Sequence, residues 1–358
     1  MDNVVFQTQL HNGVLNTHNT CNSSEIKRRQ PPSLRIRALD AAQPFDYETR
    51  LSEQFEQSTK LKIAIIGFGN FGQFLAKAFV RQGHTVLATS RQNYSSTAES
   101  LGVSFYSDPH DLCEQHPDII LISTAILSFE KVLKSLPIQR LRRNTLFIDV
   151  LSVKEFPKKV FLETLPNHFD ILCTHPMFGP ESGKHSWKDL PFVYDKVRIG
   201  SEESRQIRVE KFLNIFKKEG CRMEEMSCAD HDMDAAGSQF MTHTVGRVLE
   251  KMHLATTPIN TKGYETLLNL VENTSSDSFD LYYGLFMYNK NALEQLERLD
   301  LAFQSLKMEL FGHLHKKLRK QMFGDEGEEV RRPVLLQLPR NGAALPAPSS
   351  DIGETSTN

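Results

Sequence analysis

The sequence predicts an α/β fold, with a doubly wound parallel sheet followed by an all-helical second domain. Between residues 61 and 150, short apolar runs alternate with longer amphipathic stretches, which is the pattern of βαβ units. A glycine-rich turn directly follows the first apolar run. After about residue 226, apolar residues recur at helical spacing and no convincing strand is present, which is typical of a helical domain.

The predicted sheet domain covers residues 61–225. We expect strands at Lys62–Ile66, Thr85–Thr89, Ile119–Ser123 and Leu146–Val150, a strand pair at Ile171–Cys173 and Phe192–Ile199, and helices that start near Gly69 and Phe129 and span Glu203–Lys218. The predicted helical domain covers residues 226–324. Its helices are expected at His231–Met252, Gly263–Val271, Phe279–Met287 and Leu293–Phe311.

The two ends of the chain differ from these domains in composition. Residues 1–60 are predicted to be a transit peptide and linker, because Asp2 and Glu25 are the only acids before residue 39 and basic residues gather at 27–37. A merely disordered N-terminus fits this composition equally well. Residues 325–358 contain acids, Pro, Gly, Ser and Thr with few large apolar residues, so we expect a disordered tail.

Length and composition exclude several classes of protein. A chain of 358 residues suits two domains, and 39% hydrophobic residues are typical of a globular protein. The net charge of -2 lacks the basic excess that nucleic-acid binding requires, and no apolar run is long enough to span a membrane. The cysteines form no CxxC pair, so neither a disulfide framework nor a metal site is expected: Cys21, Cys113, Cys173, Cys221 and Cys228.

The glycine-rich turn predicts a dinucleotide site of the Rossmann type. It lies between a clear strand and a clear helix, and its cofactor-binding candidates are Gly67, Phe68, Gly69, Asn70, Phe71 and Gly72. Gly67 permits the tight turn, Gly69 lets the backbone approach the pyrophosphate, and Gly72 allows close packing of helix on strand. The helix N-terminus then offers N–H groups to the phosphates. The alternative is a glycine turn in another α/β fold.

Residues after the second and third strands refine this prediction. NAD-selective sites usually carry an acid after the second strand, but this chain has Ser90 and Arg91, with Ser95 and Ser96 nearby. Arginine beside hydroxyl groups favours the 2′-phosphate of NADP, so we expect NADP rather than NAD. Arg91 could also be an ordinary solvated loop residue. Ser123 and Thr124 follow the third strand and are expected near the nicotinamide ribose.

Three further segments carry a resemblance to a known family. They are DVLSVK at residues 149–154, THPMFGPESG at 174–183, and His231-Asp232 followed by Gln239 and His243. Together with the glycine-rich turn they resemble the TyrA family, the prephenate and arogenate dehydrogenases. The sequences of these segments are similar to those of the plant arogenate dehydrogenases in that family. The resemblance runs from about Leu61 to Phe323.

The resemblance implies oxidation of a cyclohexadienol, with hydride transfer to the cofactor and loss of CO2. His175 matches the catalytic histidine of the family, and imidazole suits proton transfer near neutral pH. Ser152 matches the serine that orients the substrate hydroxyl. Lys154 could hold the following loop or the cofactor, without a chemical step. From the residues alone, a histidine before proline is often structural.

The resemblance also implies substrate contacts. Gln239 and His243 lie one helical turn apart and match residues that face the substrate, although they could instead lie at a domain interface. His231 and Asp232 open this helix, where we expect them to cap it.

Microbial prephenate enzymes generally carry a carboxylate-binding arginine in the helical domain, and the aligned segment at residues 271–277 contains none. Asp277 could attract the ammonium group of arogenate and repel a purely anionic substrate, or it could cap the helix from Phe279. Lys262, or backbone groups near Gly183, would then bind the substrate carboxylates.

The expected activity is therefore NADP-dependent oxidative decarboxylation of arogenate to tyrosine. The alternatives are a prephenate dehydrogenase and a non-catalytic NADP-binding regulator on the same scaffold. The resemblance further implies a homodimer formed by the helical domain, feedback by tyrosine at the active site, and a chloroplast location. No metal is expected to take part.

Overall fold

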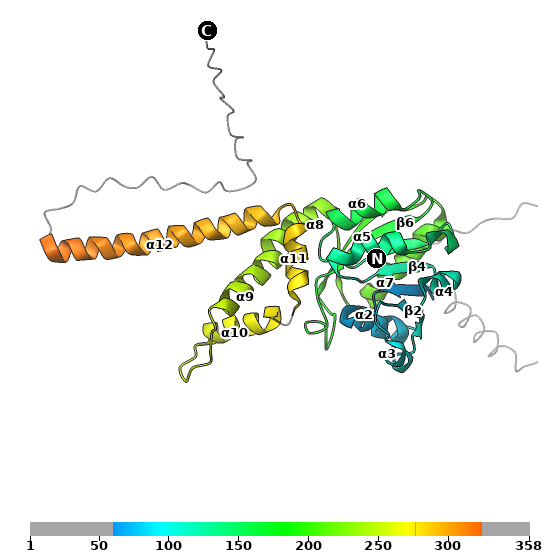
Figure 1. Cartoon of the computed structure of the whole chain (residues 1–358), viewed down its shortest axis with the longest axis horizontal. Coiled ribbons are helices and arrows are strands. Elements are labelled where there is room, and N and C mark those ends of the chain that lie inside the picture. The colour runs from blue at the N-terminus through cyan, green and yellow to red at the C-terminus, as the bar shows by residue number, and fades with distance from the viewer. Residues whose placement is uncertain (1–59, 276, 324–358) are drawn as a thin grey trace, which may run out of the picture. The chain divides into compact units, whose positions relative to one another are not determined.

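The computed structural model describes residues 60–275 and 277–323 (Figure 1). The predicted transit peptide and the predicted tail lie outside these residues, apart from Lys60. Within the described part of the chain, no helix is both long and apolar enough to cross a membrane.

A mostly parallel sheet forms the first part of the fold, as predicted. Its strands among the described residues are β1 Lys62–Ile66, β2 Thr85–Thr89, β3 Ser104–Phe105, β4 Ile119–Ile122, β5 Leu146–Asp149, β6 Asp170–Pro176, β7 Pro191–Arg198 and β8 Arg222–Glu225. Their order across the sheet is β3-β2-β1-β4-β5-β6-β7-β8. The order reverses between β1 and β4, which pair in parallel with Ile66 opposite Ile122.

One edge of the sheet contains an antiparallel pair. β7 runs antiparallel to β6, and β8 runs parallel to β7. A parallel connection needs a crossover of a dozen or more residues, usually a helix. The segment from β6 to β7 contains no helix, and the chain turns back instead.

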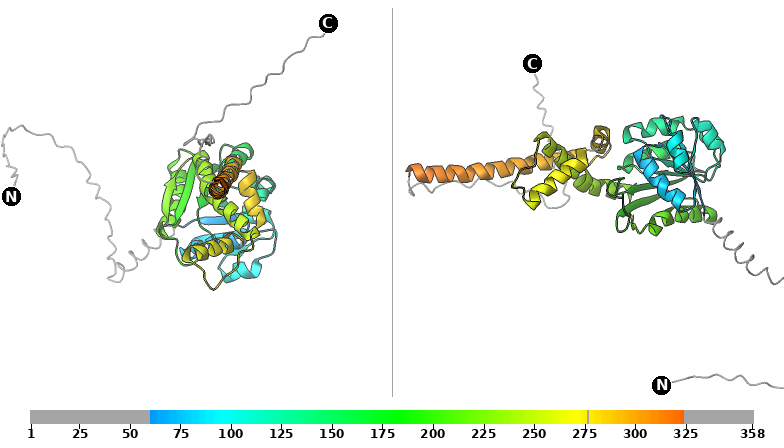
Figure 2. Two further views of the ribbon diagram at one scale, coloured as in Figure 1. Left: turned by 90° about the vertical axis from the view of Figure 1, so that its left-hand side faces the viewer. Right: turned by 90° about the horizontal axis from the view of Figure 1, so that it is seen from below.

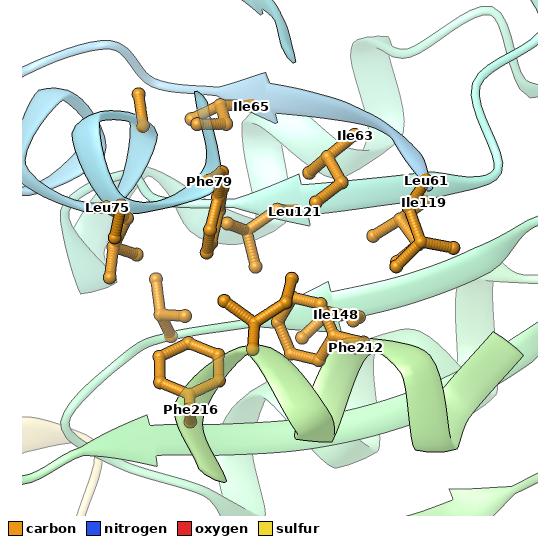
Figure 3. Close-up of a cluster of buried hydrophobic side chains, with 14 of the residues drawn as sticks. Leu61, Ile63, Ile65, Leu75, Phe79, Ile119, Leu121, Ile148, Phe212 and Phe216 are labelled. Atoms are coloured by element: carbon orange, nitrogen blue, oxygen red, sulfur yellow. The ribbon is translucent and has the colours of Figure 1, made fainter. Parts of the chain in front are cut away.

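Helices cover both faces of the sheet. α2 Asn70–Arg81, α3 Ser95–Ser100 and α7 Glu203–Lys218 pack on one face, and α4 Pro109–Glu114, α5 Phe129–Ser135 and α6 Glu155–Thr164 pack on the other, with short 3-10 turns at Ile126–Ser128 and Ile138–Arg140. Because side chains alternate along a strand, Ile63 and Ile65 meet the first group and Ile66 the second. Figure 3 shows Phe79 of α2 and Phe212 of α7 meeting over the sheet.

The second part of the chain is helical, as predicted (Figure 2). Its elements are α8 Cys228–Ala235, a π-helix at Ala236–Phe240, α9 Met241–Lys251, α10 Lys262–Ser275, α11 Phe279–Met287 and α12 Ala292–Phe323. The single helix expected from His231 to Met252 is thus interrupted by a π-helical turn, a feature that often marks functional sites.

Close packing of α9 on α10 holds the end of α10 in place. A Cβ atom at Gly246 would lie 2.1 Å from the Thr274 hydroxyl oxygen, so this contact requires glycine. Thr274 is buried, and Asp277 follows it by three residues. The contact therefore fixes where the segment that contains Asp277 lies relative to α9.

Candidate active site

The predicted cofactor residues gather at one edge of the sheet. Gly67 follows β1, Ser90 and Arg91 follow β2, and Ser123 and Thr124 follow β4. The carboxyl ends of parallel strands share one edge, and the reversal of strand order at β1 and β4 opens a crevice there. This edge is where doubly wound folds bind nucleotides.

The three glycines of the turn have different surroundings. Gly67 has φ 99°, and a Cβ atom there would lie 2.4 Å from the Ser123 carbonyl oxygen. A Cβ atom at Gly72 would lie 2.4 Å from the Gly67 carbonyl oxygen. Nothing lies within 4 Å of a Cβ atom at Gly69. The fold therefore requires Gly67 and Gly72, whereas Gly69 leaves open space beside the N-terminus of α2 for a phosphate group.

The other residues of the turn divide between core and surface. Phe68 is fully buried against Tyr94 and Phe105, so its side chain belongs to the core and not to a cofactor surface. Phe71 is half-buried and packs on Phe74 of the same helix, while Asn70 is exposed at the start of α2.

Two hydroxyl groups after β4 fit a bound ribose. The Ser123 Oγ and Thr124 Oγ1 atoms are buried and have no hydrogen-bond partner among the described residues. Buried polar atoms without partners are rare in native proteins, so a ligand group is expected beside them. Arg91 is exposed just beyond β2, and Ser90 is half-buried beside it.

A buried ion pair lies beneath the loop that carries Ser152. The Lys154 ammonium group contacts the Asp149 carboxylate and donates to the Thr174 carbonyl oxygen at 2.6 Å. Burial raises the pKa of Asp149, and the charge of Lys154 opposes that rise. Lys154 therefore joins the ends of β5 and β6, and half-buried Ser152 lies between Asp149 and Lys154 in the chain.

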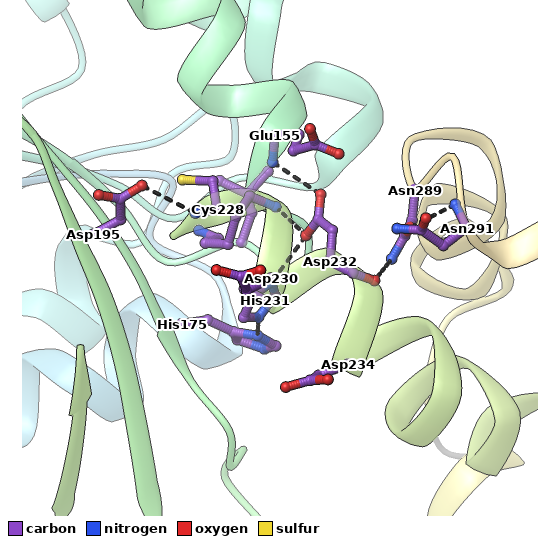
Figure 4. Close-up of polar contacts among 12 residues, drawn as sticks. Glu155, His175, Asp195, Cys228, Asp230, His231, Asp232, Asp234, Asn289 and Asn291 are labelled. Carbon is purple, nitrogen blue, oxygen red and sulfur yellow. Dashed lines mark hydrogen bonds and ion pairs between the residues drawn. The ribbon is translucent and has the colours of Figure 1, made fainter. Parts of the chain in front are cut away.

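His175 lies near the end of β6 and is only 3% exposed. Its Nδ1 atom is 2.8 Å from Nε2 of His231, whose Nδ1 is 2.8 Å from Asp232 Oδ1 (Figure 4). Burial lowers the pKa of His175 well below its usual value, and the positive charge of nearby Lys154 lowers it further. The imidazole is therefore neutral near pH 7 and able to accept a proton.

A second polar cluster lies on one face of the π-helix and α9. Gln239, His243 and Arg247 follow one another at intervals of four residues, and each has a buried side-chain atom without a hydrogen-bond partner among the described residues. Asp277 completes the cluster, with its Oδ2 atom 3.7 Å from His243 Nδ1. Burial lowers the pKa of His243, and the Asp277 carboxylate partly offsets this effect.

Curated relatives cover most of the chain. Over 311 residues, 87% of each protein, it is 67% identical to "Arogenate dehydrogenase 2, chloroplastic" of Arabidopsis thaliana. It is 64% identical over 280 residues to "Arogenate dehydrogenase 1, chloroplastic" of the same plant, and that alignment covers 78% of this chain and 44% of the relative. The chain belongs to the prephenate and arogenate dehydrogenase family.

Domain models and a solved structure agree with this family. The model of the "Prephenate dehydrogenase, nucleotide-binding domain" matches residues 75–225, and a "TYRAAT1-like, C-terminal domain" matches residues 248–322. The fold is similar to that of prephenate dehydrogenase from A. aeolicus in complex with hydroxyphenyl propionate and NAD+, with TM-score 0.57 and 19% identity over 73% of this chain and 94% of that one. The chain is thus a dehydrogenase with a nucleotide-binding domain.

The dehydrogenase does not use His231 and Asp232 as caps of their own helix, so that prediction was wrong. Ser227 caps α8 by accepting from the Asp230 N–H at 3.1 Å. Asp232 instead accepts from the backbone N–H groups of Lys154 at 2.7 Å and Glu155 at 2.9 Å. Both carboxylate oxygens thus meet the first turn of α6, which lies nearly eighty residues earlier in the chain.

The helix-cap alternative for Asp277 was also wrong. Ser278 caps α11 by accepting from the Leu281 N–H at 3.2 Å. The Asp277 side chain instead faces His243, and its backbone carbonyl accepts from Arg247 Nη2 at 2.5 Å. Sequence reasoning missed Arg247, although its spacing of four residues from His243 on one helix would have placed it on the same face.

The structure does not bring Lys262 or Gly183 to this cluster. Lys262 is exposed at the first residue of α10, roughly 20 Å along that helix from Ser275. The Gly183 N–H donates to the Gly179 carbonyl oxygen, and its Cα faces Phe74. Gly183 lines a separate cavity of about 480 Å³ along α2.

Proposed function

We propose that this chain is an arogenate dehydrogenase, which converts arogenate to tyrosine and CO2. The observation that carries the proposal is a neutral, buried imidazole at the carboxyl edge of a nucleotide-binding sheet, in a chain 67% identical to a plant arogenate dehydrogenase. Held by the glycine-rich turn and Arg91, NADP would supply the acceptor for the hydride that leaves the ring carbinol carbon. The proton of the ring hydroxyl passes to His175 Nε2, and loss of CO2 leaves an aromatic ring.

His175 and Ser152 act on the same hydroxyl group in this proposal. Ser152 lies beyond the end of β5, and His175 lies near the end of the neighbouring parallel strand β6, in which Cys173 pairs with Asp149. Ser152 hydrogen-bonds the hydroxyl and orients it toward the imidazole. Decarboxylation needs little further help, because aromatisation drives it once hydride leaves, and the protein mainly positions the ring.

NADP is the proposed cofactor because of Arg91. We expect Arg91→Ala to raise the KM for NADP at least tenfold, since the guanidinium would contact the 2′-phosphate, and to leave the KM for NAD within about twofold. Steady-state assays at 340 nm measure both constants. Arg143→Ala, at another exposed arginine, is the matched control. Equal effects of Arg91→Ala on the two cofactors would contradict this proposal.

Asp277 is proposed to select arogenate over prephenate. Its carboxylate beside His243 would attract the substrate ammonium group, while Arg247 would receive a substrate carboxylate. We expect Asp277→Asn to shift the ratio of kcat/KM for arogenate to that for prephenate about tenfold toward prephenate, because one charge contact is lost.

A side-by-side steady-state comparison of the two substrates measures this ratio, and Asp280→Asn, at an exposed position of α11, is the control. If wild-type enzyme preferred prephenate, the assignment of arogenate would be wrong. If neither substrate supported NADP reduction, the result would favour the alternative that the chain is a non-catalytic NADP-binding regulator.

The assembly and regulation are part of the same proposal. Large apolar side chains of α12 face solvent, among them Phe303 at 66% and Leu310 at 62% exposure, and an apolar groove between α9 and α12 contains Val248 and Leu296. We propose that a second copy of the chain covers them in a homodimer. Tyrosine, which carries the same α-amino acid group as the substrate, would inhibit at the active site. The relatives named chloroplastic support a plastid location.

A further inference from the structure

A buried line of three side chains ends at His175. Asp232 Oδ1, His231 and His175 are joined by two contacts of 2.8 Å, and none of the three side chains is more than 3% exposed (Figure 4). His175 comes from β6, whereas His231 and Asp232 come from α8. Water does not reach these contacts, so the ring nitrogens that face a neighbouring side chain must form their hydrogen bonds with that side chain.

The positions of the protons on His231 and His175 can be assigned by starting from Asp232. Asp232 accepts two backbone N–H groups, of Lys154 and Glu155, which only an ionised carboxylate accommodates well. An ionised carboxylate is an acceptor, so His231 must donate from Nδ1–H. A second proton on this buried ring would place a positive charge out of water and close to Lys154, so the ring is uncharged and presents a lone pair at Nε2.

The same logic fixes the proton on His175. Two lone pairs facing each other at 2.8 Å would repel, so His175 Nδ1 must carry a hydrogen and donate to His231. His175 Nε2 is then the atom with the free lone pair. Without this contact, the tautomer would depend on whatever partner each nitrogen found.

We propose that His231 and Asp232 are positioning residues that hold His175 in the Nδ1–H tautomer, so that Nε2 is the proton acceptor. In the reaction the substrate O–H bond breaks, its proton joins Nε2, and Nδ1–H remains on His175. The imidazolium formed faces His231 and, behind it, the negative charge of Asp232. The negative charge of Asp232 stabilises the imidazolium, whereas the positive charge of Lys154 destabilises it. Lys154 lies in the β5–α6 loop and is paired with Asp149. The inference rests on the proposed role of His175.

Direct observation of the tautomer tests this inference without any change to the protein. In the full chain labelled with ¹⁵N-histidine, the nitrogen shifts of His175 are expected to show Nδ1 protonated and Nε2 unprotonated near pH 7.5. The His175→Gln variant assigns the signals by their loss. An Nε2–H tautomer in the wild-type protein would overturn the inference.

Two substitutions of His231 test the consequence for turnover. We expect His231→Phe to lower kcat about 10²-fold, with the KM for NADP within threefold, because the tautomer is no longer held. The amide oxygen of glutamine in His231→Gln can still accept from His175 Nδ1–H. We therefore expect His231→Gln to have a kcat at least tenfold higher than that of His231→Phe. A purely structural role would predict no such recovery.

His168→Phe, at an exposed histidine just before β6, is the matched control. Normal kcat in His231→Phe beside an inactive His175→Ala would overturn the positioning role of His231 and leave the role of His175 standing. Activity in His175→Ala would instead remove the proposed proton acceptor itself.

Discussion

His175→Ala is expected to lower kcat with arogenate by about 10³-fold, which removes measurable turnover, while the Kd for NADP changes less than about threefold. The imidazole is the proton acceptor of the proposed reaction, and alanine offers no atom to replace it. Its Nδ1 is already engaged by His231, so the loss falls on the free Nε2 and not on cofactor contacts. Steady-state kinetics and fluorescence titration with NADP measure the two quantities.

His168→Ala is the control for this substitution, because His168 is exposed just before the start of β6, at the amino edge of the sheet. It should behave as wild type in both measurements. Retention of more than a tenth of the wild-type kcat by His175→Ala would refute the assignment of the base.

Lys154→Met is expected to reduce the free energy of unfolding by about 3–5 kcal/mol. Methionine fills a similar volume, but Asp149 then remains in the core without its positive partner, and the Thr174 carbonyl oxygen loses its donor. The double variant Asp149→Leu/Lys154→Met removes both charges and should be more stable than Lys154→Met alone. Urea denaturation of the three proteins measures the difference.

An exposed lysine of the same helix serves as the comparison. Lys159 of α6 lies 3.9 Å from Glu163, and both side chains are largely exposed. Lys159→Met should change the free energy of unfolding by less than about 1 kcal/mol, because solvent-exposed ion pairs contribute little. Similar losses for Lys154→Met and Lys159→Met would mean that burial of the first pair has no energetic consequence.

Features encoded by neighbouring residues were predictable from the sequence. β1, the glycine-rich turn and α2 follow one another within twenty residues, and each carries its own local pattern of apolar residues or glycines. The short edge strands β3 and β8 were not predicted, because Ser104–Phe105 and the half-polar Arg222–Glu225 carry no apolar run. The direction of β7 depends on a loop without a helix, which apolar periodicity does not report.

Contacts between distant segments explain the errors at the site. An aspartate near a helix start favours capping on local grounds, yet Asp232 meets backbone groups of Lys154 and Glu155. The partner of Asp277 is His243, thirty-four residues earlier, and it meets that residue because Gly246 lets α10 pack closely on α9. Such pairings follow from tertiary packing and have no signature in a short window of sequence.

The contact of Asp232 with the start of α6 limits how the enzyme can open. Asp232 accepts from both the Lys154 and Glu155 N–H groups, and its carbonyl oxygen accepts from Asn289 Nδ2 at 2.7 Å. A hinge motion that swung α8 away from the sheet would break all of these bonds and separate His231 from His175. We therefore expect substrate entry and product release to use a hinge further along the chain, so that the contact of His175 with His231 is kept throughout the proposed catalytic cycle.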